Sequence, residues 1–78
     1  MPRYYFNLRS YSDADDAQGV ELVDEAAARE LAVESARELV YADIANGWLN
    51  LDHRIEVVDE AGDHVLTMVF RDAFTTTR

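Results

Sequence analysis

One segment of the chain has the length and pattern of a long helix, and it separates two shorter regions that resemble strands. Residues 24–47, DEAAARELAVESARELVYADIANG, begin with Asp24, a favourable N-cap, and end with Asn46 and Gly47, a typical helix stop. At about 100° per residue, mostly small side chains gather within roughly 100° of arc. They are Ala28, Leu31, Ala32, Ser35, Leu39 and Ala42. Small side chains let a helix approach a sheet closely, so we expect this stripe to pack across one sheet face.

Two strands are expected before the helix. Residues 3–9, RYYFNLR, place Tyr4, Phe6 and Leu8 on one side of an extended strand, and aromatic residues favour strands. Residues 19–23, GVELV, predict a short second strand. We expect the two strands to pair as a hairpin with a long polar connection.

The C-terminal part predicts a second hairpin. Residues 54–71, RIEVVDEAGDHVLTMVFR, turn either through a type I turn with Gly62 in the left-handed conformation and a G1 bulge, or through a two-residue turn. The first turn sets Val57 opposite Val65, the second sets it opposite Leu66, and both registers stay open. The preceding stretch, GWLNLDH at residues 47–53, is too apolar for a free loop, so we expect it to cap the core.

The order strand, strand, helix, strand, strand indicates an α+β fold: a small, mainly antiparallel sheet of about four strands with one long helix on one face. The 78 residues form a single domain, with a compact part over about residues 2–73 and a frayed tail at 74–78. The last strand is apolar on both sides, and Tyr41 and Ile44 are poor choices for a purely solvated helix face. One helix covers only one side of a sheet, so the apolar residues on the other side are expected to be covered by the segment around Trp48 or by a partner subunit.

The charge balance excludes several classes of function. Sixteen acidic residues oppose seven arginines and no lysine, for a net charge of −9. The arginines are scattered singly, which argues against binding to nucleic acid or to an anionic membrane. No stretch approaches the roughly twenty apolar residues of a membrane span, and the N-terminus lacks the apolar core of a signal peptide. A cytoplasmic location is therefore expected.

The densest acidic cluster lies in residues 11–21, YSDADDAQGVE. An EF-hand calcium loop beginning at Asp13 fails at two of its first six positions. Asp13, Asp15 and Asp16 therefore remain weak candidates for binding a divalent cation, and a solvated turn is the favoured interpretation.

No catalytic residue and no cofactor are expected. The chain has no cysteine for a nucleophile or a thiolate metal site, and no glycine-rich phosphate loop. Ser10 and Ser12 have no histidine placed by sequence to act as a base. His53 and His64 belong roughly 16–20 Å apart along the hairpin, at about 3.3 Å per residue, so they cannot share a metal. We therefore expect a protein that is not an enzyme.

The remaining candidates are interface residues, because tyrosine and arginine are enriched at protein interfaces and the last strand is apolar on two sides. They are Tyr5, Arg9, Tyr11, Leu66, Met68 and Phe70. We expect a small non-enzymatic protein–protein interaction domain that self-associates as a homodimer. The alternatives are an acidic module that binds a basic protein by charge mimicry, and a weak divalent-cation-binding domain.

Three stretches carry a resemblance to a known family: PRYYFNLR, GVELVDEAAARELAVESARELV and IEVVDEAGDHVLTMVFRDA. Over residues 2–73 the chain resembles short acidic proteins common in alphaproteobacteria, catalogued as a domain of unknown function. The shared features are the aromatic first strand, the helix entry at residues 19–24, the turn at 59–62 and the ending at 70–72. The resemblance implies a bacterial origin and the domain boundaries, and it implies no activity, cofactor or catalytic residue.

Overall fold

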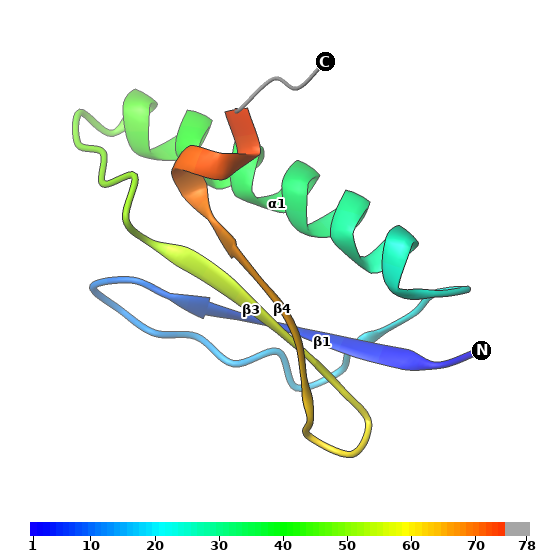
Figure 1. The fold of residues 1–78 in the computed structure, drawn as a ribbon. Helices are drawn as coiled ribbons and strands as arrows, with labels where there is room; N and C mark the ends of the chain where they lie inside the picture. The colour runs from blue at the N-terminus through cyan, green and yellow to red at the C-terminus, as the bar shows by residue number, and fades with distance from the viewer. Residues whose placement is uncertain (75–78) are drawn as a thin grey trace.

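The structure, a computed structural model, describes residues 1–74. Its elements are β1 (Arg3–Arg9), β2 (Val20–Glu21), α1 (Glu25–Ala45), β3 (Arg54–Asp59), β4 (His64–Val69) and η1, a 3-10 helix (Phe70–Phe74). Figure 1 shows α1 lying diagonally over one face of the sheet, with η1 between the end of β4 and the helix. The expected α+β fold with one long helix is confirmed. Apart from Phe74, the expected frayed tail lies outside the described residues.

The four strands form one antiparallel sheet in the order β2-β1-β3-β4. β1 pairs with β2 through Arg3 opposite Glu21 and Tyr4 opposite Val20, so the expected first hairpin is confirmed. β1 also pairs with β3 from Tyr4 to Arg9, and the other neighbour of β3 is β4. β1 and β3 therefore form the centre of the sheet, and β2 and β4 form its edges.

The second hairpin combines the two registers that the sequence left open. Gly62 has a φ of +84°, and its N–H donates to the Asp59 carbonyl at 2.9 Å, as in a type I turn followed by a left-handed glycine. The ladder then shifts between Val58 and Val57, so that Val57 lies opposite Leu66. The turn therefore matches the first alternative, a type I turn with a left-handed glycine. The pairing of Val57 with Leu66 matches the second alternative, because a β-bulge between Val57 and Val58 shifts the ladder.

The helix begins and ends where the sequence predicts. The Asp24 carboxylate accepts from the Ala27 N–H at 2.9 Å, and Asn46 forms the C-cap. The predicted stripe, however, is rotated. The fully or nearly fully buried helix residues are Ala28, Ala32, Ala36 and Val40, whereas Ala42 is exposed. η1, which the sequence pattern does not reveal, packs against α1: Arg37 donates to the Ala73 carbonyl, and Val40 lines a groove together with Phe74.

η1 closes the core, and the segment at residues 47–53 contributes to the cover in part. Phe70 and Ala73 of η1 are 1% exposed, and His53, which is 8% exposed, packs against Phe70, whereas Trp48, Leu49 and Leu51 are 36–47% exposed. Leu66, Met68 and Phe70, named above as interface candidates, belong to the core cluster beneath the helix. Because the chain itself covers these three side chains, they need no partner and are not accessible to one.

The connection between β1 and β2 runs back along β1. Leu8 and Ala14 exchange two backbone hydrogen bonds of 2.7 and 3.0 Å. Gly19, with a φ of +71°, lies so close to β1 that a Cβ atom there would be 2.9 Å from the Arg3 Cγ and the Tyr5 Cε2. Glycine is therefore required at this position by both conformation and space.

We predict that Gly19→Ala lowers the free energy of unfolding more than Gly47→Ala does. Both glycines have a positive φ, which costs an L-residue about 1–2 kcal/mol. A Cβ atom on Gly47 would meet nothing within 4 Å, whereas a Cβ atom on Gly19 would press on β1. Urea unfolding of the two variants and the parent protein measures the difference, and equal losses would contradict the close approach at Gly19.

Candidate functional site

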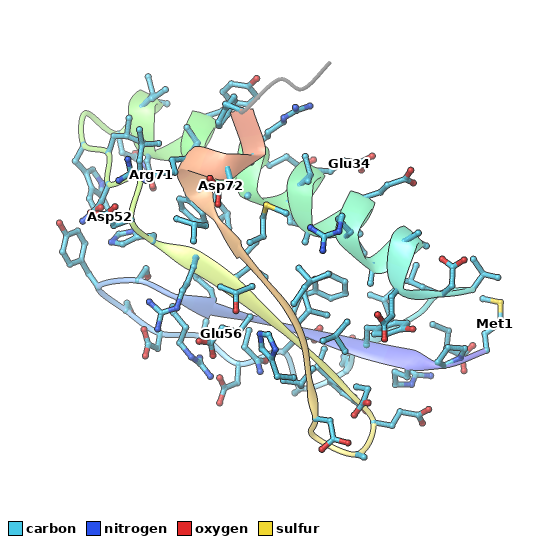
Figure 2. All side chains as sticks on the ribbon, in the orientation of Figure 1. Met1, Glu34, Asp52, Glu56, Arg71 and Asp72 are labelled. Carbon is cyan, nitrogen blue, oxygen red and sulfur yellow. The ribbon has the colours of Figure 1, made fainter. Side chains whose placement is uncertain are left out.

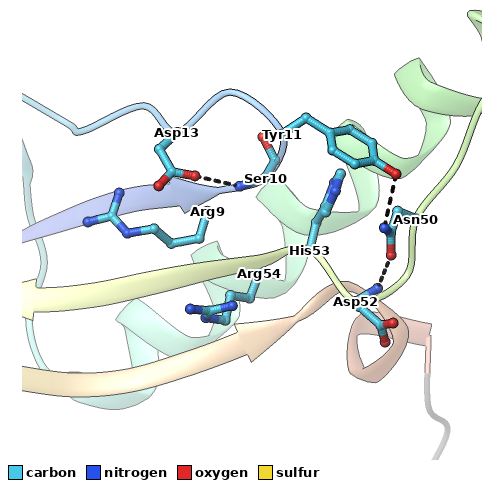
Figure 3. A pocket seen from close by; sticks show the side chains of 8 residues that line it. All are labelled: Arg9, Ser10, Tyr11, Asp13, Asn50, Asp52, His53 and Arg54. Carbon is cyan, nitrogen blue, oxygen red and sulfur yellow. Dashed lines mark hydrogen bonds between the residues drawn. The ribbon is translucent and has the colours of Figure 1, made fainter.

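A polar cleft lies where β1 ends and β3 begins (Figure 3). It encloses about 310 Å³ and is lined by side chains from β1, from the connection after it and from the segment before β3. The lining residues are Arg9, Ser10, Tyr11, Asp13, Asn50, Asp52, His53 and Arg54. The cleft thus brings together two of the predicted interface residues, one of the predicted cation ligands and a histidine.

Carboxylates neutralise both arginines of the cleft. Arg9 pairs with Asp15 at 2.7 Å and with Glu56 at 3.3 Å, and Glu56 also pairs with Arg54 at 3.2 Å. The hydrogen bond to Asp15 raises the pKa of Arg9 above its ordinary value, so the guanidinium stays charged and held. The cleft therefore does not present an uncompensated positive charge to an anionic ligand.

His53 is the buried histidine of the cleft, with 8% of its surface exposed. Its ring packs edge-on against Tyr11 at 4.7 Å and Phe70 at 5.9 Å between centroids. Tyr11 also stacks on Trp48 at 5.2 Å. The Ser10 hydroxyl donates to the Ser12 carbonyl at 3.1 Å and not to the imidazole. This arrangement is a packed aromatic cluster, and it lacks the paired nucleophile and base of covalent catalysis.

The three aspartates proposed as weak cation ligands point to different partners. Asp13 accepts from the Ser10 N–H at 3.0 Å, and Asp15 accepts from the Arg9 guanidinium. Asp16 accepts only from backbone groups of β1 and its own loop. Across residues 1–74, three or more histidine, aspartate or glutamate side chains nowhere gather as metal ligands would.

The Asp16 carboxylate accepts a backbone hydrogen bond from β1 at a position where a neighbouring strand would otherwise pair. In all, it accepts from the N–H groups of Phe6, Gln18 and Gly19 at 3.2, 3.1 and 3.0 Å, while the Asp16 N–H donates to the Asn7 side chain at 2.9 Å. Burial opposes ionisation of this carboxyl, but the N–H groups of Gly19, Phe6 and Gln18 outweigh burial and hold its pKa below the ordinary 3.8. The sequence offered no signal that separated Asp16 from its acidic neighbours.

We predict that Asp16→Asn lowers the free energy of unfolding by about 1–3 kcal/mol at neutral pH, because charge-assisted hydrogen bonds are weakened. Since the folded pKa lies below the unfolded one, the ionised carboxylate stabilises the fold above pH 3.8, and this contribution is lost as the pH falls through the folded pKa. Urea unfolding of the parent protein and of Asp16→Asn should therefore show a difference in the free energy of unfolding that is smaller at acidic pH than at neutral pH.

Asp15→Asn is the matched control for this test. Asp15 is exposed and pairs only with Arg9, so its loss should change the free energy of unfolding by less than about 1 kcal/mol. Equal effects of the two substitutions, or a gap at Asp16 that persists unchanged in acid, would contradict the role assigned to Asp16.

A second candidate site is apolar and lies at the C-terminal end of α1. Side chains from the helix, the following segment and η1 line an open groove of about 260 Å³. The lining residues are Val40, Tyr41, Ile44, Leu51, Arg71 and Phe74. Tyr41 is 60% exposed and Ile44 57% exposed, and the Tyr41 ring lies 5.9 Å from that of Phe74. We call the five apolar residues of this lining the apolar surface.

Charged side chains lie around the apolar surface, and one of them, Arg71, also lines the groove. Arg37 lies 5.7 Å above the Phe74 ring and donates to the Ala73 carbonyl at 2.7 Å. Arg71 pairs with Asp52, and Figure 2 shows these two side chains near the C-terminal end of α1. Along the outer side of α1, Glu30, Glu34 and Glu38 follow at four-residue spacing and are exposed. The outward side of the helix thus changes from acidic to apolar towards its C-terminus.

Of the remaining interface candidates, Arg9 and Tyr11 line the cleft, whereas Tyr5 lies farther along β1, opposite Val58. Tyr11 is 72% exposed above His53, whereas Tyr5 and Arg9 are half-buried on the sheet face that α1 does not cover. No helix within the described chain is long and apolar enough to cross a lipid bilayer.

Comparison with known proteins identifies one family. Its model matches residues 3–71, and its description is domain of unknown function (DUF6894). No curated protein and no solved structure matches the chain.

Proposed function

The chain belongs to this family of unknown function, and we propose that it is a small non-enzymatic interaction domain that binds a segment of a basic protein through the apolar surface. The observation that carries the proposal is the exposed groove between Tyr41, Ile44, Leu51 and Phe74. Large apolar side chains this exposed on a small domain are typical of an interaction site.

The shape of the apolar surface suits insertion of apolar side chains from a partner. The groove is open, its walls come from three separate segments, and two of them contribute aromatic rings. Aromatic residues and arginine, which rim this groove as Phe74, Tyr41 and Arg71, dominate binding energy at protein interfaces. A partner segment with two or three large apolar side chains on one face would fill a space of this size.

The charge of the chain supports a basic partner. The net charge is −9, and the carboxylates of Glu30, Glu34 and Glu38 on α1 form no ion pair with another described residue. By contrast, the acidic residues of the loop at 13–21 are engaged by their own chain. The glutamates of α1, next to the apolar surface, would therefore contribute most of the electrostatic attraction for a basic partner.

This proposal joins two of the expectations from the sequence, the interaction domain and the acidic module. The resemblance to alphaproteobacterial proteins supports a bacterial setting for it, and a cytoplasmic location stays an expectation from the sequence. Binding of a divalent cation gains no support, since Asp13, Asp15 and Asp16 diverge toward separate partners.

The proposal predicts that a synthetic amphipathic helix of leucine and lysine binds the protein in isothermal titration calorimetry. Ile44→Glu should weaken this binding at least about tenfold, because a charge then occupies the groove. Added salt should weaken binding further, since the helix acids contribute attraction.

Two controls separate binding in the apolar groove from attraction by charge alone. Ala26→Glu adds the same charge to an exposed position at the other end of α1 and should leave the affinity nearly unchanged. A peptide with glutamate in place of lysine should bind weakly or not at all. Equal affinity of the parent protein and the Ile44→Glu variant, or no binding of the lysine peptide, would overturn the proposal.

A further inference from the structure

The outer side of β4 carries backbone groups that the described chain leaves without a strand partner. The Phe70 N–H donates to the His53 carbonyl at 2.8 Å, so the backbone groups of Phe70, and by alternation those of Met68 and Leu66, face β3. Those of Thr67 and Val69 therefore point away from the sheet. No loop, helix or side chain of residues 1–74 bonds to them.

The two edges of the sheet differ in how they are protected. The β2 edge is a two-residue strand, and Asp16 and the bridge between Leu8 and Ala14 take up neighbouring groups of β1. β4 has six residues and contains no proline, carboxylate or arginine. Short strands, charges and prolines are the usual devices against edge-to-edge pairing, and β4 has only the bulge near His64.

We infer that β4 pairs antiparallel with β4 of a second copy of the chain, around a twofold axis beside Thr67. A second copy brings an equally uncharged strand, whereas docking of two copies through the acidic outer side of α1 would bring carboxylates together. The outward positions Thr67 and Val69 are β-branched, which suits cross-strand contacts in a sheet. The inference does not use the apolar surface.

The helix side next to β4 fits the same twofold arrangement. Arg37 bonds to η1, which continues from β4, so the side of α1 that carries Arg29, Val33 and Arg37 faces this edge. These residues, with Glu30 and Glu34, line an open groove of about 530 Å³ beside the half-buried Val33. This side carries both arginines and glutamates, so two antiparallel copies of it do not bring only like charges together.

The test is the oligomeric state in sedimentation equilibrium over the micromolar range. The parent protein should sediment as two chains of 8.9 kDa, and Thr67→Lys should raise the dissociation constant at least about tenfold, because two like charges face each other on the axis. Thr67→Val keeps the branched shape without a charge and should remain dimeric. A parent protein that stays a monomer would overturn the inference.

Amide hydrogen exchange of the unmodified protein provides a test that needs no variant. The N–H groups of Thr67 and Val69 should exchange slowly at high concentration and rapidly after dilution, whereas that of Met68 stays protected in both cases. Fast exchange at Thr67 and Val69 at every concentration would overturn edge pairing.

Failure of this inference is distinguishable from failure of the proposed function. Ile44→Glu should leave the dimer intact, because Ile44 lines the apolar groove and not the β4 edge. If the dimer is lost in Ile44→Glu but kept in Thr67→Lys, the second copy docks through the apolar surface, and pairing at β4 is refuted.

Discussion

Burial of one sheet face under a single helix is the interaction on which the rest of the structure depends. Ala28, Ala32 and Ala36 are fully buried, so the α1 backbone lies close to the sheet, and larger side chains such as Val57 and Phe70 fill the space from below. A helix is about 10 Å wide, whereas four strands at about 4.8 Å spacing span more. The core therefore needs a second cover near β4, and η1 supplies it with Phe70 and Ala73.

This closure decides which surfaces are left for other molecules. The alanine-rich side of α1 packs on the sheet, and η1 covers the end of β4. The apolar side chains at the C-terminal end of the helix therefore remain exposed to solvent. The outer backbone of β4 also remains open, since η1 turns away from the edge after Val69. An edge-paired dimer would carry two copies of the apolar surface, and a partner with two basic segments would then bind with a gain from multivalency.

Local signals in the sequence predicted much of the fold. Asp24, Asn46 and Gly62 each act through their own backbone neighbourhood, so the helix bounds and the hairpin turn could be found without tertiary information. Three other features could not be found this way, because each depends on how η1 and the strands pack. They are the bulge between Val57 and Val58, the rotated helix stripe and the exposure of Trp48. The same holds for the sites: the apolar character of Tyr41 and Ile44 was a visible signal, whereas nothing distinguished Asp16 from Asp13 and Asp15.

In this view of the fold, the short chain completes its core without help from another molecule. The decisive experiment is urea unfolding, followed by Trp48 fluorescence, at dilutions where the protein sediments as a single chain. We expect a cooperative unfolding transition that persists under these conditions, with a midpoint that dimer formation only raises. Loss of the transition on dilution, with the spectrum of an unfolded chain, would show instead that a partner finishes the core.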